Sequence, residues 1–230
     1  MYKRQPLQKP HPPIWVPGSG SVETWEWISE QGHVYCYLSY SGYKRGIQVM
    51  KGFWEQMEKK GVDDNPYRAG FLQLVAVSET DEKAEEEYGP HVDYFYKKCL
   101  HVFEGFQEAP GYRTIKSLEK GLITPSGGSA SEKKNTTWQD YIENGNIIAG
   151  SPSTVIKGLR KAVEGLRVGH LMVLLQIGSM PKDLTTKNTE LFAKHVLPEI
   201  QGMWDEYEDH WWPKPLAERV VGEVNTSAAD

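Results

Sequence analysis

The sequence is poor in cysteine and has no long apolar run. Only two of its 230 residues are cysteines, Cys36 and Cys99, so at most one disulfide could form. Both stand among apolar and aromatic neighbours, and we expect both to be buried, unreactive thiols. The longest aliphatic run, residues 171–175, is far below the ~20 residues that cross a bilayer, and no apolar signal segment begins the chain. These absences argue against a disulfide scaffold and a membrane protein, and predict a cytoplasmic one.

Excess positive charge and metal-ligand patterns are missing too. The chain has 31 acidic against 26 basic residues, a formal net charge of −5, which leaves no basic surplus to neutralise a nucleic-acid backbone. Its seven histidines form no His-Glu-x-x-His pattern, and no Cys-x-x-Cys occurs. We therefore expect neither a nucleic-acid partner nor a metal site, and function has to be sought in motifs.

What is present is an alternation of apolar strands and amphipathic helices. Strands alternating with helices predict a parallel sheet of the α/β class, and four such units are half of an eight-stranded barrel. The predicted strands are residues 14–16, 33–38, 71–77 and 171–177, and the predicted helices are residues 22–31, 45–60, 153–165 and 185–200, with a further helix beginning at residue 81.

Two regions interrupt this alternation. Residues 105–146 are rich in Gly, Ser and Lys without periodicity, which indicates an insertion that is either an active-site lid or a decorative loop. The tail after Met203 carries aromatic residues that we expect to pack on the domain or on a second subunit. The turn at Gly150, Ser151 and Pro152 follows the insertion and not a strand, so we interpret it as an ordinary helix start.

Three motifs carry a resemblance to a known family. They are PLQKPHPPIWV at residues 6–16 with GSGS at 18–21, GSPSTV at 150–155, and ELFA at 190–193 with VLP at 196–198. In this order and spacing they resemble the bacterial luciferase-like flavin-dependent monooxygenases. The resemblance implies a (β/α)8 TIM-barrel fold of which residues 6–202 are the C-terminal half, including the insertion at about 105–146, with a tail at 203–230.

The same resemblance implies that the chain is a fragment. The family's first four strands are absent, and residues 1–5 look like a non-native leader. A further ~150 to 200 upstream residues in alternating β/α pattern would complete a barrel of typical size. Four strands cannot close a barrel, so we expect the isolated chain to expose unpaired strand edges.

The turn from Gly18 to Ser21 is the candidate cofactor site. After a parallel strand, small residues let the backbone approach an anion at the positive end of the following helix. From the residues alone, a helix start without a ligand fits equally well. The resemblance implies that the phosphate of FMN lies on Gly20 and Ser21, with Gly18 and Ser19 in the same turn.

Four further residues are candidates for the substrate pocket. Alkanesulfonate-oxidising relatives have an arginine and a histidine on the third strand, where this chain has Leu72 and Leu74, so the resemblance implies an uncharged, apolar substrate. The two leucines could equally fill the barrel interior. Gln176 could donate to a flavin or substrate oxygen or cap a strand end, and Arg113 could close over an anion or remain solvated.

The resemblance implies a two-component monooxygenase. Reduced FMN, supplied by a separate NAD(P)H-dependent flavin reductase, and O₂ would serve to oxygenate a small organic substrate, and the full-length protein is expected to be a homodimer. The catalytic residues remain unknown because they would come from the absent half, so this chain alone is expected to be inactive. The alternatives are an F420-dependent hydride-transfer oxidoreductase of the same fold and a non-catalytic barrel subunit.

Overall fold

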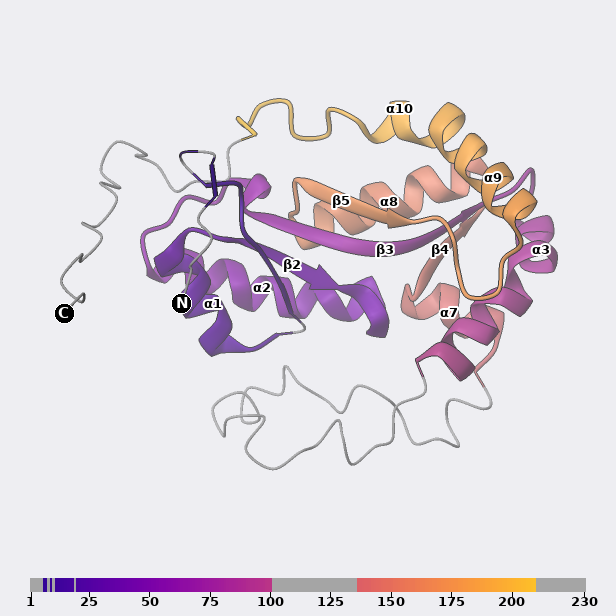
Figure 1. Cartoon of the computed structure of the whole chain (residues 1–230), viewed down its shortest axis with the longest axis horizontal. Coiled ribbons are helices and arrows are strands. Elements are labelled where there is room, and N and C mark those ends of the chain that lie inside the picture. Colours follow the sequence, from indigo (N-terminus) through magenta and orange to yellow (C-terminus); the bar gives the residue numbers. More distant parts are fainter. Residues whose placement is uncertain (1–5, 8, 10, 19, 101–135, 210–230) are drawn as a thin grey trace.

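The protein is a parallel sheet with helices packed on it (Figure 1), as the α/β prediction required. The computed structural model describes residues 6–7, 9, 11–18, 20–100 and 136–209. The strands are β1 (Trp15–Gly18), β2 (Val34–Leu38), β3 (Ala69–Val77), β4 (Ile147–Gly150) and β5 (His170–Leu174). The helices are α1 (Val22–Gln31), α2 (Tyr43–Lys59), α3 (Asp81–Tyr94), α7 (Trp138–Asn144), α8 (Pro152–Leu166), α9 (Lys182–Leu191) and α10 (Leu197–Ile200).

Four of these strands are the four that the sequence predicts, and they are consecutive neighbours in the sheet. β1 pairs with β2, β2 with β3, and β3 with β5, and every pairing is parallel. Since residues 70–72 pair with both β2 and β5, those strands lie on opposite edges of β3. β4 pairs with residues 74–77 of β3. It lies on the same edge of β3 as β2, beyond the point where β2 ends (Figure 1).

The strand β4 corrects the interpretation of the turn at Gly150. We predicted that this turn follows the insertion directly, but it follows a strand whose four residues are all buried. A four-residue apolar segment beside a Gly/Ser-rich region has too few positions to show a period. The prediction of an irregular insertion is also wrong for residues 138–144, which form α7, while residues 105–135 lie outside the described part.

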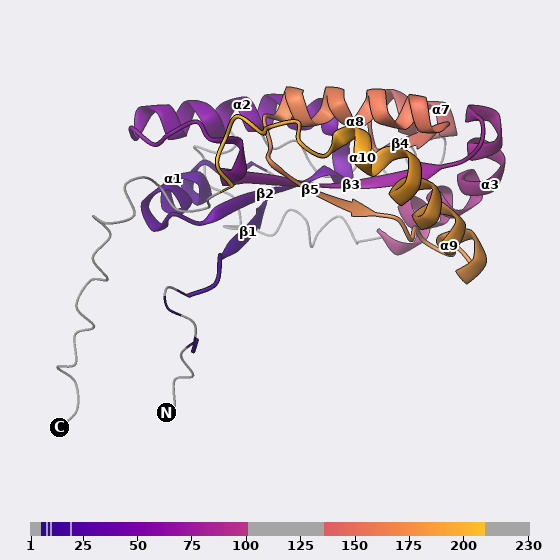
Figure 2. The same cartoon turned by 90° about the horizontal axis from the view of Figure 1, so that it is seen from above.

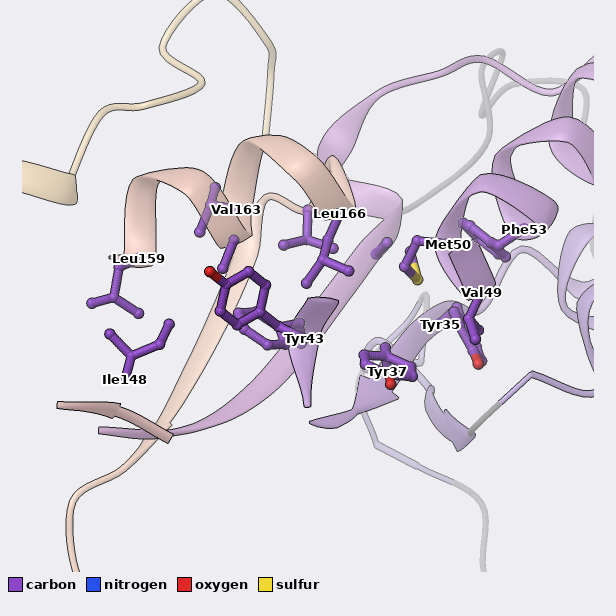
Figure 3. Packing of buried hydrophobic residues seen from close by; sticks show 14 of the residues in the cluster. Tyr35, Tyr37, Tyr43, Val49, Met50, Phe53, Ile148, Leu159, Val163 and Leu166 are labelled. Atoms are coloured by element: carbon purple, nitrogen blue, oxygen red, sulfur yellow. The ribbon is translucent and has the colours of Figure 1, made fainter. Parts of the chain in front are cut away.

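One face of the sheet is covered by helices, with α2 and α8 side by side (Figure 2). In α2 the buried residues Val49, Met50, Phe53 and Met57 recur at helical spacing and form one stripe. They pack with side chains of α1, α8 and the sheet in a cluster that includes Tyr35, Tyr37, Leu159, Val163 and Leu166 (Figure 3).

The opposite face is covered at the carboxyl half of β3 by α3 and α7. At the amino ends of the strands, the ring of Trp15 lies 4.7 Å from that of His170, and that of Tyr67 lies 5.3 Å from it on another side. Trp15 passes over Gly70, where a Cβ atom would come within 2.7 Å of the indole. β2 and β3 lie between β1 and β5, so in a flat sheet Trp15 of β1 could not reach His170 of β5. The contact between their rings therefore shows that the sheet curls towards the face that carries Trp15 and Gly70.

The cysteines and the tail complete the comparison with the sequence. Cys36 is buried in β2, where burial raises its pKa to about 11, but Cys99 is exposed, so the prediction that both are buried is wrong for Cys99. The described part of the tail packs on the domain as expected, since Trp204 Nε1 donates to the Val168 carbonyl at 2.8 Å.

None of the described helices has the length and apolar character of a membrane span.

A buried asparagine joins α9 to the sheet where β3 and β5 separate. The pairing of the two strands ends at Leu74. Beyond it, Asn188 Nδ2 donates to the carbonyls of Val75 at 2.9 Å and Leu175 at 2.8 Å, while its Oδ1 accepts from Val77 N at 2.7 Å. One side-chain amide therefore replaces strand-to-strand hydrogen bonds at the carboxyl end of the sheet.

A carboxylate from α3 caps the start of α8. Asp81 Oδ1 accepts from Ser151 N at 2.6 Å, and its Oδ2 accepts from Thr154 Oγ1 at 3.0 Å. Gly150 has a φ of 141°, and a Cβ there would collide with this carboxylate. Burial raises the pKa of Asp81, but the hydrogen bonds from Ser151 and Thr154 outweigh it and the pKa is lowered. A negative charge of the chain itself thus lies at the N-terminus of α8.

The substitution Asn188→Ala tests the first of these contacts. It leaves three buried backbone groups without partners, so we expect the free energy of unfolding to fall by about 2 to 4 kcal/mol. Urea denaturation measures the change. Thr189→Ala, which removes an exposed hydroxyl on the same helix, is the control and should change it by under about 0.5 kcal/mol. Equal effects would show that Asn188 does not join α9 to the sheet.

The substitution Asp81→Asn tests the cap of α8. Because the pKa of Asp81 is lowered on folding, its contribution is complete above the unfolded value of about 3.9 and disappears as pH falls through the folded value. We expect a loss of about 1 kcal/mol at pH 7 that vanishes once the pH has fallen below the lowered pKa of folded Asp81. Glu82→Gln, in the same first turn of α3, controls for helix-dipole effects, and a loss independent of pH would contradict the assignment.

Candidate functional site

The candidate residues gather where the parallel strands end. In parallel α/β sheets the turns that follow the strands meet at one end of the molecule, and ligands bind there. The structure places Gly18 at the end of β1, Gly20 and Ser21 directly after it, Leu72 and Leu74 on β3, and Gln176 after β5, while Ser19 and Arg113 lie outside the described residues. Since β2 separates β1 from β3, the leucines lie two strands away from the β1–α1 turn.

The β1–α1 turn presents a helix start that its own N-cap leaves open. Ser21 has extended backbone, and its hydroxyl accepts no hydrogen bond from the first turn of α1 but donates to Glu23 Oε2 at 3.1 Å. Gly20, with a φ of 126°, is buried beside it. The first backbone hydrogen bond of the helix is Trp25 N to the Ser21 carbonyl, at 3.2 Å. This turn therefore differs from the start of α8, where the carboxylate of Asp81 accepts the N–H of the N-cap residue Ser151.

A tyrosine from the next strand lies beneath this turn. A Cβ on Gly18 would stand 3.0 Å from Cε2 of Tyr35 and 3.3 Å from its hydroxyl, so a side chain there would press against the tyrosine ring. The Tyr35 ring is stacked on Phe53 with centroids 5.0 Å apart and meets Trp25 edge-on at 6.2 Å. The Tyr35 hydroxyl and the Trp25 Nε1 are buried without a hydrogen-bond partner.

Sequence reasoning missed Tyr35 and Trp25 as part of this site. Both are large, buried residues in a strand and a helix, and that pattern alone indicates core packing. The register of β1 against β2 brings the Tyr35 hydroxyl to Gly18, and only the folded chain shows that register. The sequence did contain one hint of their role. Tyr35 and Trp25 each bring a polar atom, the phenol oxygen and the indole nitrogen, into an otherwise apolar segment close to the glycine turn.

The pocket candidates on β3 and after β5 have different surroundings. Leu74 is completely buried among side chains of α3 and α7, whereas Leu72 is half-buried on the same face and pairs with Met172 of β5. Gln176 is exposed, and its Nε2 donates to the Gly178 carbonyl at 3.0 Å, which closes the loop after β5 on itself.

Paired charges follow the end of β3. Lys187 Nζ lies 3.0 Å from Glu79 Oε2 and 2.7 Å from Glu87 Oε1, and the buried Ser78 hydroxyl lies within hydrogen-bond distance of both carboxylates and can donate to either. The hydrogen bond from Lys187 is the main cause that lowers the pKa of Glu79 to about 2. Glu79 is therefore ionised at neutral pH and suits holding α9 against α3 better than donating a proton. The described residues contain no group of three or more His, Cys, Asp or Glu side chains able to hold a metal.

Solved structures share this architecture. The oxygenating constituent of 3,6-diketocamphane monooxygenase from Pseudomonas putida, in complex with FMN, superposes with a TM-score of 0.57 at 20% identity over 83% of this chain and 49% of its own. The monooxygenase RslO1 from Streptomyces bottropensis gives 0.54 at 15% identity with the same coverages. An F420-dependent secondary alcohol dehydrogenase in complex with an F420-acetone adduct gives 0.50 at 15% identity over 82% and 49%.

These similarities establish the fold, and a family model establishes the family. The chain spans about half the length of the solved structures that it resembles. A comparison with curated protein sequences gives no match. The family model described as luciferase-like monooxygenase matches residues 1–168, which is well over half of the chain. The chain therefore belongs to the luciferase-like monooxygenase family.

Proposed function

We propose that this chain supplies the phosphate-binding end of a flavin-dependent monooxygenase. The phosphate of FMN would lie on Gly20 and Ser21 at the start of α1, with Gly18 and Ser19 in the same turn. The observation that carries this proposal is the contrast between two similar turns. Neither N-cap serine caps its own helix, but at α8 the carboxylate of Asp81 lies at the helix start and accepts the Ser151 N–H, whereas at α1 the Ser21 hydroxyl donates to Glu23 and the preceding strand ends in glycine.

The turn can bind a phosphate through backbone groups. The N–H groups in the first turn of α1 and the positive end of the helix dipole both favour an anion. The absence of a side chain at Gly18 and Gly20 lets that anion approach the backbone closely. The Ser21 hydroxyl would leave Glu23 Oε2, 3.1 Å away, to donate to the phosphate. Glu23 thus competes with the ligand for the hydrogen bond of the Ser21 hydroxyl. A ligand with little negative charge would be the weaker acceptor of the two and would bind poorly.

The chemistry of the proposed reaction belongs to the cofactor. When bound, reduced FMN supplies the electrons with which O₂ is activated. The protein binds the cofactor, orients the substrate and excludes water from the site. The reduced FMN would come from a separate NAD(P)H-dependent flavin reductase. The half-buried Leu72 would line the substrate pocket and favour a small apolar substrate, with Gln176 and Arg113 as its polar groups. Leu74, which is completely buried among side chains of α3 and α7, would support the pocket from behind. The acid–base residues would lie outside this chain, which alone would be inactive, and the full-length enzyme would be a homodimer.

The pair Ser21→Asp and Ser21→Asn tests the phosphate turn. Both side chains can cap α1 and they are nearly isosteric, but only Asp places a negative charge against the phosphate. We expect Ser21→Asp to weaken FMN binding at least about tenfold, and Ser21→Asn to change it less than about threefold. Quenching of flavin fluorescence measures both affinities. Equal affinities for the two variants would remove Ser21 from the site, whatever their common value.

F420-dependent hydride transfer is the second candidate, because the solved structures of similar fold include an F420-dependent dehydrogenase. We expect the protein to bind FMN at least about tenfold more tightly than F420 in parallel titrations, since the FMN phosphate is a terminal dianion that suits an uncapped helix start. Tighter binding of F420 would favour the hydride-transfer function. A full-length protein that binds neither cofactor would favour a non-catalytic barrel subunit.

A further inference from the structure

We propose that Tyr35 is a positioning residue for the β1–α1 turn, and that its hydroxyl makes the protein prefer a phosphorylated flavin over an unphosphorylated one. In this proposal the hydroxyl donates to the Gly20 carbonyl when the Ser21 N–H turns to the phosphate. The inference rests on the proposed function, because it assumes that the anion bound at this turn is the cofactor's phosphate.

The first support is the place of the hydroxyl. Tyr35 lies on β2 and its side chain is completely buried, with the hydroxyl 3.3 Å from the position of a Cβ on Gly18. Burial raises the pKa of Tyr35, while hydrogen-bond donors of the Trp25 indole and the Gly20 backbone N–H oppose that rise, so both groups lie near the phenol oxygen and the Gly20 carbonyl does not yet face it. The hydroxyl therefore faces the turn from inside the protein, opposite the side on which an anion would approach.

The second support is that the hydroxyl has no partner. Neither Tyr35 Oη nor the neighbouring Trp25 Nε1 has a partner in good hydrogen-bond geometry, although the Trp25 side chain and the Gly20 backbone lie close enough to the phenol oxygen to act on the pKa of Tyr35 as hydrogen-bond donors. A buried polar atom without a partner costs about 1 to 3 kcal/mol, and a phenylalanine would fill the same space against Phe53 without that cost.

The third support is the geometry of a peptide unit. The N–H and C=O groups of one peptide point in opposite directions, so turning the Ser21 N–H outward to an anion turns the Gly20 carbonyl inward. Gly20 already has a φ of 126°, a conformation open to glycine, and can accept this rotation. The Tyr35 ring is held between Phe53 and Trp25, so the hydroxyl stays in place while the backbone moves.

The experiment compares two flavins that differ only in the phosphate. Affinities of the chain for FMN and for riboflavin are measured by fluorescence quenching, together with the melting temperature without ligand. For Tyr35→Phe we expect FMN binding to weaken about tenfold, the loss of one good hydrogen bond, and riboflavin binding to stay unchanged. The melting temperature should stay level or rise, because no hydrogen bond is lost in the free protein.

Tyr37→Phe is the matched control. Tyr37 lies two residues along the same strand and is equally buried, but its hydroxyl donates to the Gly42 carbonyl at 3.3 Å, away from the β1–α1 turn. We expect this variant to melt at a lower temperature and to keep the wild-type ratio of FMN to riboflavin affinity. The two variants thus separate loss of packing from loss of phosphate selection.

Two negative results have different meanings. If the wild-type chain prefers FMN and Tyr35→Phe keeps that preference, the role of Tyr35 is wrong and the phosphate turn stands. If the wild-type chain binds both flavins equally or binds neither, the phosphate turn itself is wrong, and the role of Tyr35 falls with it.

Discussion

Parallel pairing along β3 is the constraint on which the rest of this structure depends. This nine-residue strand pairs with β5 on one edge and with β2 and then β4 on the other. Because all these strands run in the same direction, each must be followed by a crossover, and the turns after them collect at one end. The buried Asn188 extends the same constraint beyond the last pair of β3 and β5. The location of the candidate site follows from this arrangement.

The two glycine-containing turns at that end show how one local motif serves two purposes. At Gly150, the carboxylate of Asp81 satisfies the helix start, so the turn fastens α8 to α3. At Gly18, the hydroxyl of Ser21 is directed to Glu23 and polar atoms beneath the turn have no partners. The difference lies in residues distant in sequence, which decide whether a helix N-terminus is filled by the protein or left for a ligand.

Much of the fold could be predicted from the sequence, because strong periodicity marks the longer elements. The apolar stripe of α2 and the continuous apolar run of β3 are visible in one dimension, and their boundaries differ by only a few residues from those predicted. The short strand β4 and the helix α7 were missed, since four to seven residues beside an irregular segment show no period. Cys99 was misplaced because apolar neighbours in sequence do not determine which side of a helical turn faces solvent.

The sequence by itself determined the parallel α/β class, the luciferase-like motifs and the position of a glycine-rich turn at the start of a helix. Only the tertiary structure decided that the Tyr35 hydroxyl lies under that turn and that Asp81 occupies the other one. The physical reason is that helix propensity, capping residues and apolar period are properties of neighbouring residues. Strand register and contacts between Asp81 and Ser151, 70 positions apart, exist only once the sheet has formed.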